Sequence, residues 1–363
     1  MEGVSRLNKK VLVGLSGGVD SAIAVKRLLE DGFDVAGLYL DMHSFDSERP
    51  IRVLSSDGEN SDIVSALQCA DSYGIELYKF GCATPFDKIV KEDFAREYSL
   101  GRTPNPCVVC NRLVKFASLL GCADYLGFEM IATGHYARVG QGENGRYYIE
   151  RGKDLRKDQS YMLWNMCQHQ LSRVVFPLGD SLKDDNFKAA RGDGLSAAER
   201  GESLDICFIG KDDNYADFIE RRLGTFPEGD FIAPDGSVCG RHKGIIRYTV
   251  GQRKGLGIAL GQPAFVKKID GIENKIYLAF SGDEYTDRVE VSGLNFVGME
   301  ETNSFEGEML VKIRYAANPV PCRVTIIGDR CTAIFPEPVR AATPGQSAVF
   351  YDGERVMFGG FID

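Results

Sequence analysis

The sequence lacks the features that mark secreted and membrane proteins. No uncharged apolar run reaches the roughly 18 residues that a membrane-spanning helix needs, and the first residues, MEGVSRLNKK, have no apolar signal-peptide core. Excess positive charge is also missing, because the formal net charge is -9. That balance argues against nonspecific nucleic-acid binding, although basic residues can still gather on one face. We therefore expect a cytoplasmic protein with no membrane partner, whose ten cysteines stay reduced.

The chain changes character along its length. At 363 residues, about two or three domains are expected. In the first half, apolar runs such as VLVGL (11–15) and DVAGLYL (34–40) alternate with helical patterns, which predicts a doubly wound parallel sheet. From the segment GIIRYTV (244–250) onward, short strand-like runs alternate with Gly, Pro and Asp-Gly turns, which is typical of small β-barrels. We expect an α/β domain over 1–210, a small central domain over 211–278 and a β-barrel over 279–363.

A glycine-rich turn, SGGVDS, joins the first predicted strand to the first predicted helix. Its glycines let the backbone approach an anion, and the helix N-terminus behind them presents unpaired N–H groups. The lysine of a Walker A loop is absent, so this is a different kind of phosphate loop. Asp20 would repel a phosphate unless Mg²⁺ lay between them, so Asp20 is a candidate Mg²⁺ ligand. The loop resembles the PP-loop of the N-type ATP pyrophosphatases, which implies ATP cleavage to AMP and pyrophosphate.

Three cysteines stand in two unusual segments, TPNPCVVCN (103–111) and ICFIG (206–210). A sulfur carrier needs one thiol to hold a persulfide and gains from a second thiol that releases the sulfur. Two prolines stiffen the approach to Cys107, and Cys110 lies near the start of a predicted helix, where the helix dipole favours a thiolate. A structural zinc site is the alternative, but no second CxxC or nearby pair of histidines completes it.

The whole chain resembles the tRNA-specific 2-thiouridylases. The matching segments, in the order of the family, are GLSGGVDS (14–21), TPNPCVVCN (103–111), KF (115–116), ATGHYAR (132–138), KDQSY (157–161), LSRVVFPLG (171–179), ICFIG (206–210), YTVGQRKGLGI (248–258), RY (314–315) and TPGQ (343–346). The resemblance implies ATP-dependent 2-thiolation of the wobble uridine of tRNA. Its partners would be the Glu, Gln and Lys tRNAs and a sulfur donor, either a cysteine desulfurase or a sulfur-relay protein.

The resemblance also implies roles for individual residues. Cys110 corresponds to the nucleophile and Cys207 to the persulfide carrier, while Asn105, Pro106 and Cys107 correspond to the segment that meets the target base. The expected ATP contacts are Gly14, Leu15, Ser16, Gly17, Gly18, Val19, Asp20, Ser21, Leu40 and Gly134. The expected tRNA contacts are His135, Lys157, Asp158, Gln159, Arg314, Tyr315 and Gln346.

Departures from the family leave two routes for sulfur open. Position 107 is Asp in part of the family and Cys in another part, and the stretch DMHSFDSERPIRV after the second predicted strand is not the family's usual sequence. The persulfide route uses Cys110 and Cys207 and is favoured. The alternative uses Cys107, Cys110 and Cys207 as ligands of a [4Fe–4S] cluster whose fourth iron binds sulfide.

Two other functions compete with thiolation. Another enzyme with a PP-loop, such as a synthetase fed by an amidotransferase, would need an ammonia source and no paired cysteines. A non-catalytic RNA-binding protein would tolerate a degenerate loop, whereas SGGVDS is intact.

Overall fold

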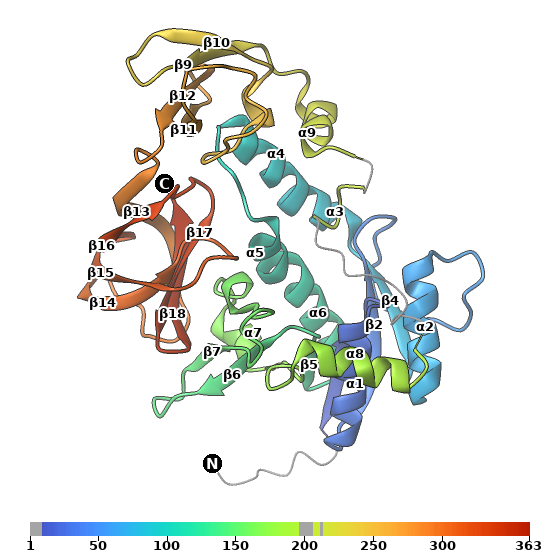
Figure 1. The fold of residues 1–363 in the computed structure, drawn as a ribbon. Coiled ribbons are helices and arrows are strands. Elements are labelled where there is room, and N and C mark those ends of the chain that lie inside the picture. The colour runs from blue at the N-terminus through green and yellow to red at the C-terminus, as the bar shows by residue number, and fades with distance from the viewer. Residues whose placement is uncertain (1–8, 196–205, 211–212) are drawn as a thin grey trace.

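The N-terminal half is built on a mostly parallel sheet, as predicted. The structure is a computed structural model that describes residues 9–195, 206–210 and 213–363 (Figure 1). The sheet has the strand order β3-β4-β2-β1-β5-β8, and only β3 runs antiparallel to its neighbour. Its strands are β1 (Lys10–Gly14), β2 (Asp34–Asp41), β3 (Ile51–Arg52), β4 (Leu77–Gly81), β5 (Met130–Ala132) and β8 (Val174–Val175).

Helices cover both faces of this sheet. Both faces present apolar side chains to them, because successive side chains of β1 point in opposite directions. Val11 and Val13 pack with α1 (Val19–Glu30), α2 (Ser61–Tyr73) and α8 (Lys183–Gly192). Leu12 points the other way, into a core that contains Phe116 and Leu119. This arrangement is the doubly wound fold that the alternating sequence pattern predicts.

One long helix lies against the second face. It consists of α5 (Pro106–Cys110), a π-helical turn η2 (Asn111–Lys115) and α6 (Phe116–Leu126). By length and composition this helix would suffice to cross a membrane. However, Phe116, Leu119 and Leu120 pack in the core of the α/β domain, so we assign it as a core helix. The helices α3 (Ala83–Phe86) and α4 (Glu92–Ser99) flank a second π turn, η1 (Asp87–Lys91).

The central part of the chain forms a small sheet of order β10-β9-β12-β11 beside helix α9 (Tyr215–Leu223). Its strands are β9 (Gly229–Ile232), β10 (Val238–His242), β11 (Ala264–Asp270) and β12 (Lys275–Phe280). The prediction of a strand over 244–250 was wrong, because this segment contains the 3₁₀ turn η5 (Ile245–Arg247). Ile245 and Ile246 are both buried in the same core. Adjacent side chains of a strand would point to opposite faces.

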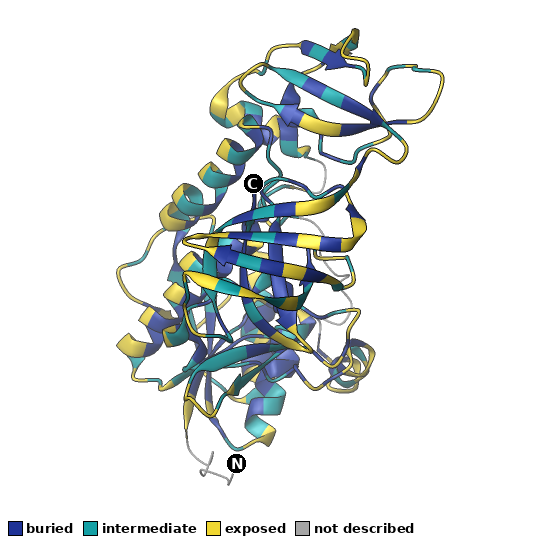
Figure 2. Cartoon of the chain, turned by 90° about the vertical axis from the view of Figure 1, so that its left-hand side faces the viewer, coloured by how far each residue is buried: buried dark blue, intermediate teal, exposed yellow. Residues whose placement is uncertain are grey.

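The C-terminal part closes into a barrel of order β13-β16-β15-β14-β17-β18, with β13 pairing β18. Buried and exposed residues alternate along many of its strands (Figure 2). The strands are β13 (Tyr285–Phe296), β14 (Ser304–Lys312), β15 (Val320–Ile327), β16 (Arg330–Arg340), β17 (Ser347–Asp352) and β18 (Arg355–Ile362). An unpredicted hairpin of the α/β half, β6 (Ala137–Gln141) and β7 (Tyr147–Arg151), pairs with β18.

The barrel and the α/β domain share one core. The segment after β7 contains η3 (Ser160–Met162) and α7 (Gln168–Leu171) and carries the chain's single tryptophan. Trp164 is fully buried and donates from Nε1 to Ser347 Oγ at 2.9 Å. A Cβ at Gly359 of β18 would lie 2.6 Å from the indole ring, so only glycine permits this approach. Val349 and Tyr351 of β17 belong to the same core cluster.

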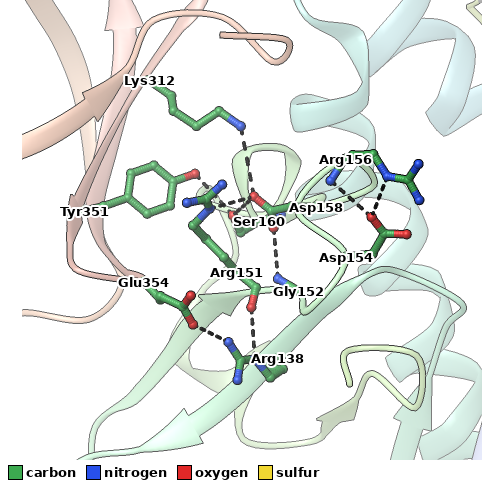
Figure 3. A network of polar contacts seen from close by, with 10 residues as sticks. All are labelled: Arg138, Arg151, Gly152, Asp154, Arg156, Asp158, Ser160, Lys312, Tyr351 and Glu354. Carbon is green, nitrogen blue, oxygen red and sulfur yellow. Dashed lines mark hydrogen bonds and ion pairs between the residues drawn. The ribbon is translucent and has the colours of Figure 1, made fainter. Parts of the chain in front are cut away.

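A buried polar network reinforces the joint (Figure 3). Asp158, only 3% exposed, accepts hydrogen bonds from the N–H groups of Gly152 and Ser160 at 3.1 Å each. Its Oδ2 also lies 3.3 Å from Arg151 Nε and 4.0 Å from Lys312 Nζ of the barrel. The expectation that Asp158 contacts tRNA is corrected here, because the carboxylate points into the protein and neutralises buried cations.

Truncating the shared core should destabilise the whole chain. We expect Trp164→Ala to cost about 3–5 kcal/mol, because it removes a large, fully buried side chain from the joint. Chemical denaturation followed by far-ultraviolet circular dichroism measures the loss. Ile327→Ala, at a barrel side chain that is 75% exposed, serves as the control and should change the stability by about 0.5 kcal/mol or less. Equal effects of the two substitutions would contradict the shared core.

Candidate active site

A single cavity of about 500 Å³ joins the two regions that the sequence singled out. Its wall includes loop residues at the end of β1 and the start of α1, together with Leu40 and Gly134. The same wall includes Pro106, Cys107, Cys110 and Cys207, as well as His135 and Gln159. Residues as far apart in the chain as Gly14 and Phe208 therefore meet at the carboxyl ends of the parallel strands, where doubly wound sheets bind ligands.

The loop SGGVDS is shaped to receive an anion. Gly18 is the N-cap of α1 and no side chain caps the helix, so its first N–H groups stay available. Ser21 Oγ donates to the Gly18 carbonyl at 2.9 Å and accepts from Ser16 N at 3.2 Å, which ties the turn to the helix. Gly17 has φ +78°, and a Cβ there would lie 2.4 Å from the Asp62 carbonyl. The turn therefore requires glycine.

Asp20 lines the cavity and has two polar partners beside the loop. Its Oδ1 accepts from the Tyr136 hydroxyl at 2.8 Å, and its Oδ2 lies 2.5 Å from Lys183 Nζ, whose side chain is 8% exposed. Lys183 therefore places a positive charge beside the Asp20 carboxylate. The expected role of Asp20 as a Mg²⁺ ligand stays a prediction, and in this structure its carboxylate forms an ion pair with Lys183.

Gly134 and His135 follow β5 and close the cavity beside this loop. A Cβ at Gly134 would lie 2.7 Å from the Asp20 carbonyl carbon, so the two backbones touch. His135 Nδ1 lies 2.7 Å from Thr133 Oγ1, and its ring packs against Phe116 and Phe176. Burial lowers the pKa of His135 well below its ordinary value, and Lys115 lowers it further. The imidazole is therefore neutral at pH 7 and offers no charge to a phosphate.

Cys107 and Cys110 lie on the long helix rather than in a loop before it. Asn105 caps the helix by accepting from Cys107 N at 3.2 Å, and Pro106 takes the first helical position, which suits proline. Cys107 is exposed and Cys110 is 8% exposed. Burial raises the pKa of Cys110 to about 12, against a smaller opposing effect of Lys115. The thiolate expected from the helix dipole is thus wrong for the free side chain, because desolvation outweighs the dipole.

Aromatic packing holds the segment that carries Cys207. The Phe208 ring packs edge-on against Phe86 at 5.8 Å and Phe94 at 5.3 Å and tilts against Phe218 at 5.2 Å, measured between centroids. These contacts anchor the turn at 206–209, which a hydrogen bond from Ile209 N to the Ile206 carbonyl closes at 2.9 Å. The Cys207 side chain is exposed and lines the cavity. Burial raises the pKa of the Cys207 thiol.

The three cysteines do not form a metal site. Across residues 9–195, 206–210 and 213–363, no three His, Cys, Asp or Glu side chains converge as metal ligands would. Cys107, Cys110 and Cys207 all lie within those ranges. The ligand set that a [4Fe–4S] cluster needs is therefore not assembled in this arrangement, and the zinc alternative finds no support among the same residues.

The remaining expected tRNA contacts lie around the joint with the barrel. Gln346 Nε2 donates to the Thr103 carbonyl at 2.7 Å, and Thr103 N donates to the Pro344 carbonyl at 2.8 Å. Tyr315 is 37% exposed, and Arg314 donates to the Ala341 carbonyl. Lys157 is half-buried in the segment before Asp158. His135 and Gln159 instead line the cavity, where the Gln159 side chain accepts from Tyr136 N at 2.9 Å.

Sequence reasoning gave no role to two cations of the site. Lys183 lies 163 residues from Asp20, so only the fold reveals their pairing. Lys115 appeared in the matched segment KF, and its distance of five residues from Cys110 was the signal that could have identified it. His43, in the stretch that departs from the family, also lines the cavity and packs against Phe86.

Comparisons with known proteins agree with this architecture. Three family models match in turn: "tRNA methyl transferase HUP domain" over 9–211, "tRNA methyl transferase PRC-barrel domain" over 216–279 and "Aminomethyltransferase beta-barrel domain" over 286–362. The chain is 41% identical to the tRNA-specific 2-thiouridylase MnmA of Lachnoclostridium phytofermentans, covering 98% of this chain and 99% of the relative. It is 40% identical to that of Geotalea uraniireducens, covering 98% and 95%.

A solved structure, the U34-tRNA thiolase NcsA from Methanococcus maripaludis with its [4Fe-4S] cluster, is 18% identical over 57% of this chain and 63% of that one. Its TM-score is 0.35, which is too low to support an argument. The sheet and its glycine-rich loop define an α/β nucleotide-binding protein of the HUP class. Within that class, the chain belongs to the tRNA-specific 2-thiouridylase family.

The shape of the loop can be tested at Gly17. We expect Gly17→Ala to weaken ATP binding by about tenfold or more, because an added Cβ meets the Asp62 carbonyl at 2.4 Å in a backbone that has positive φ. Isothermal titration calorimetry with ATP measures the change. Gly58→Ala has a similar φ of +74° with open space around it, so it reproduces the strain without the clash. ATP binding that is equal in both variants would contradict the assignment.

Proposed function

We propose that this protein carries out the ATP-dependent 2-thiolation of the wobble uridine, U34, of tRNA. The observation that carries the proposal is the single cavity lined both by the PP-loop, Gly14 to Ser21, and by Cys107, Cys110 and Cys207. A thiolation enzyme needs an activated oxygen and a sulfur nucleophile at the same carbon. The family to which the chain belongs supplies the expectation of tRNA as substrate.

The first step activates a poor electrophile. The C2 oxygen of uridine attacks the α-phosphorus of ATP, which forms an O–P bond and releases pyrophosphate. The uncapped N-terminus of α1 and the Ser16 and Ser21 hydroxyls are placed to hold the phosphates. Family members use ATP with Mg²⁺, and the chain's own contribution at Asp20 is its ion pair with Lys183. Leu40 and Gly134 line the cavity beside the loop, where we place the rest of the nucleotide.

The second step transfers sulfur. The outer sulfur of a Cys207 persulfide attacks C2, a C–S bond forms, and AMP leaves with the electron pair of the C2–O bond. The Cys110 thiolate then attacks Cys207 Sγ. A Cys110–Cys207 bond forms, the bond from Cys207 to the transferred sulfur breaks, and its electron pair becomes the thiocarbonyl of 2-thiouridine. The two cysteines are thereby oxidised to a disulfide, and the transferred sulfur is reduced.

We favour the persulfide over the iron–sulfur cluster. The persulfide needs only Cys110 and Cys207, which line the same cavity, whereas the cluster needs a three-cysteine ligand set that is not assembled. Cys107 then remains with Asn105 and Pro106 as the segment that meets the flipped base. Extrusion of the base from its stack costs a few kcal/mol, and exposed Cys107 at the helix start is accessible to it.

We assign the domains by task. Residues 1–210 would catalyse the reaction, and residues 211–278 would connect this domain to the barrel. Residues 279–363 would contact tRNA, together with Lys157, Gln159 and His135. Arg314, Tyr315 and Gln346 lie on the barrel side of the joint. The substrates would be the Glu, Gln and Lys tRNAs, sulfur would come from a cysteine desulfurase or relay protein, and the reaction would take place in the cytoplasm.

The direct test is a reconstituted reaction with ATP, unmodified tRNA, a cysteine desulfurase with cysteine as the persulfide donor, and a thiol reductant that returns the Cys110–Cys207 disulfide to two thiols. We expect 2-thiouridine in the nucleoside mass spectrum, and AMP and pyrophosphate as the tRNA-dependent nucleotide products on chromatography. A synthetase fed by ammonia would consume ATP without making thiouridine. A non-catalytic RNA-binding protein would bind tRNA and leave ATP intact. Formation of ADP and phosphate would exclude a PP-loop mechanism.

The persulfide carrier can be tested by substitution. We expect Cys207→Ala to abolish 2-thiouridine formation while the affinity for tRNA stays unchanged, because the side chain lies at the cavity and not at the barrel. Cys239→Ala, a cysteine of the central sheet that donates to the Phe231 carbonyl at 3.4 Å, is the matched control and should retain activity. Thiolation by purified Cys207→Ala would refute the role.

A further inference from the structure

Lys115 lines the cavity that contains Cys107, Cys110 and Cys207. Among the described residues that line the cavity, it is the only lysine or arginine. The described parts of the chain give its ammonium group no hydrogen bond or ion pair, although it is half-buried. A partly desolvated ammonium group is stabilised by a nearby anion. The anions that this cavity can generate beside the helix are the sulfurs of its cysteines.

The π-helical turn explains why Lys115 faces those cysteines. In an α-helix, two residues five positions apart point about 140° away from each other. The turn η2 covers Asn111–Lys115, and Phe116 N donates to the Asn111 carbonyl in the i to i+5 pattern. Such a turn brings residues five apart onto one side of the helix, so Lys115 shares a face with Cys110. Single π turns of this kind are frequent at functional sites.

The second π turn offers an internal comparison. η1 ends at Lys91, whose ammonium group lies 3.6 Å from Asp87 Oδ1 and 5.3 Å from the centroid of the Phe86 ring. Lys91 therefore has a carboxylate partner on its own turn, although Asp87 also pairs with Arg222. Within residues 9–195, 206–210 and 213–363, Lys115 has no such partner, and it lines the cavity together with the three cysteines.

We propose that Lys115 supplies the positive charge that stabilises anionic sulfur while the bond between Cys207 and the transferred sulfur is exchanged for the Cys110–Cys207 bond. The negative charge begins on Cys110 Sγ and ends on the sulfur bound to C2. Both positions lie inside the cavity that Lys115 lines. This inference rests on the proposed function, because it gives Lys115 a task in that exchange.

The electrostatics agree with a role at sulfur rather than at phosphate. Burial raises the pKa of Cys110, Cys107 and Cys207, and Lys115 acts in the opposite direction on all three. Lys91 also lowers the pKa of Cys207, by less than Lys115 does. The two histidines of the cavity, His43 and His135, have lowered pKa values and carry no charge at pH 7 that could replace it. Phosphates, in contrast, already have the N-terminus of α1.

The test measures thiol reactivity separately from thiolation. The full chain is labelled with iodoacetamide near neutral pH, at about 7.5, in the absence of ATP and tRNA. Peptide mass spectrometry then gives the alkylation rate of Cys110. We expect Lys115→Met to lower this rate about tenfold, as the loss of one charge neighbour predicts. We expect Lys115→Arg to restore most of it. Lys88→Met, at an exposed lysine of η1, is the matched control and should leave the rate unchanged.

Kinetics of the reconstituted reaction complete the test. In Lys115→Met we expect kcat for thiolation to fall while KM for ATP and for tRNA stays unchanged, with the circular dichroism and melting temperature of the native chain retained. Wild-type alkylation in Lys115→Met would overturn the proposal, as would a change confined to KM for ATP, which would place the charge at the phosphates. Failure of the wild-type chain to thiolate tRNA would refute the proposed function, while the labelling comparison would still report on Lys115.

Discussion

The burial of the helix from Pro106 to Leu126 is the constraint on which the rest of the site depends. Phe116, Leu119 and Leu120 fix its C-terminal part between the parallel sheet and the segment of Trp164. Its first turns are then held at the mouth of the cavity, because Asn105 caps them and Pro106 starts them. A helix is a rigid element, so the packing of its C-terminal part in the core also fixes the positions of the side chains at its start.

Burial that positions Cys110 also opposes its ionisation. Its neighbours in the local core, Phe86, Val90 and Val114, are apolar, and they raise the pKa of the thiol to about 12. The site thus fixes the position of the thiol at the cost of its reactivity, and the role that we propose for Lys115 would offset this cost.

Much of the fold could be predicted from local pattern, because buried parallel strands read as short apolar runs and SGGVDS marks the first turn. The character of individual site residues could not. Cys110 was expected as a thiolate, but the helix begins at Pro106 and the thiol is desolvated by residues distant in sequence. Asp158 was expected as a tRNA contact, but its carboxylate is buried beside Arg151 and Lys312. Such outcomes depend on tertiary contacts that no local window contains.

The joint between the barrel and the α/β domain has a consequence for the loop that leads to Cys107. Thr103 exchanges hydrogen bonds with Pro344 and Gln346 of the barrel side, and Arg102 Nη2 donates to the Ile362 carbonyl at 3.3 Å. The loop that carries Asn105 and Cys107 is therefore held by the element to which we assign tRNA contacts. The barrel also shares the core of Trp164 with the α/β domain. A tRNA bound by the barrel would therefore be positioned relative to the cysteines by a packed interface and not by a flexible linker.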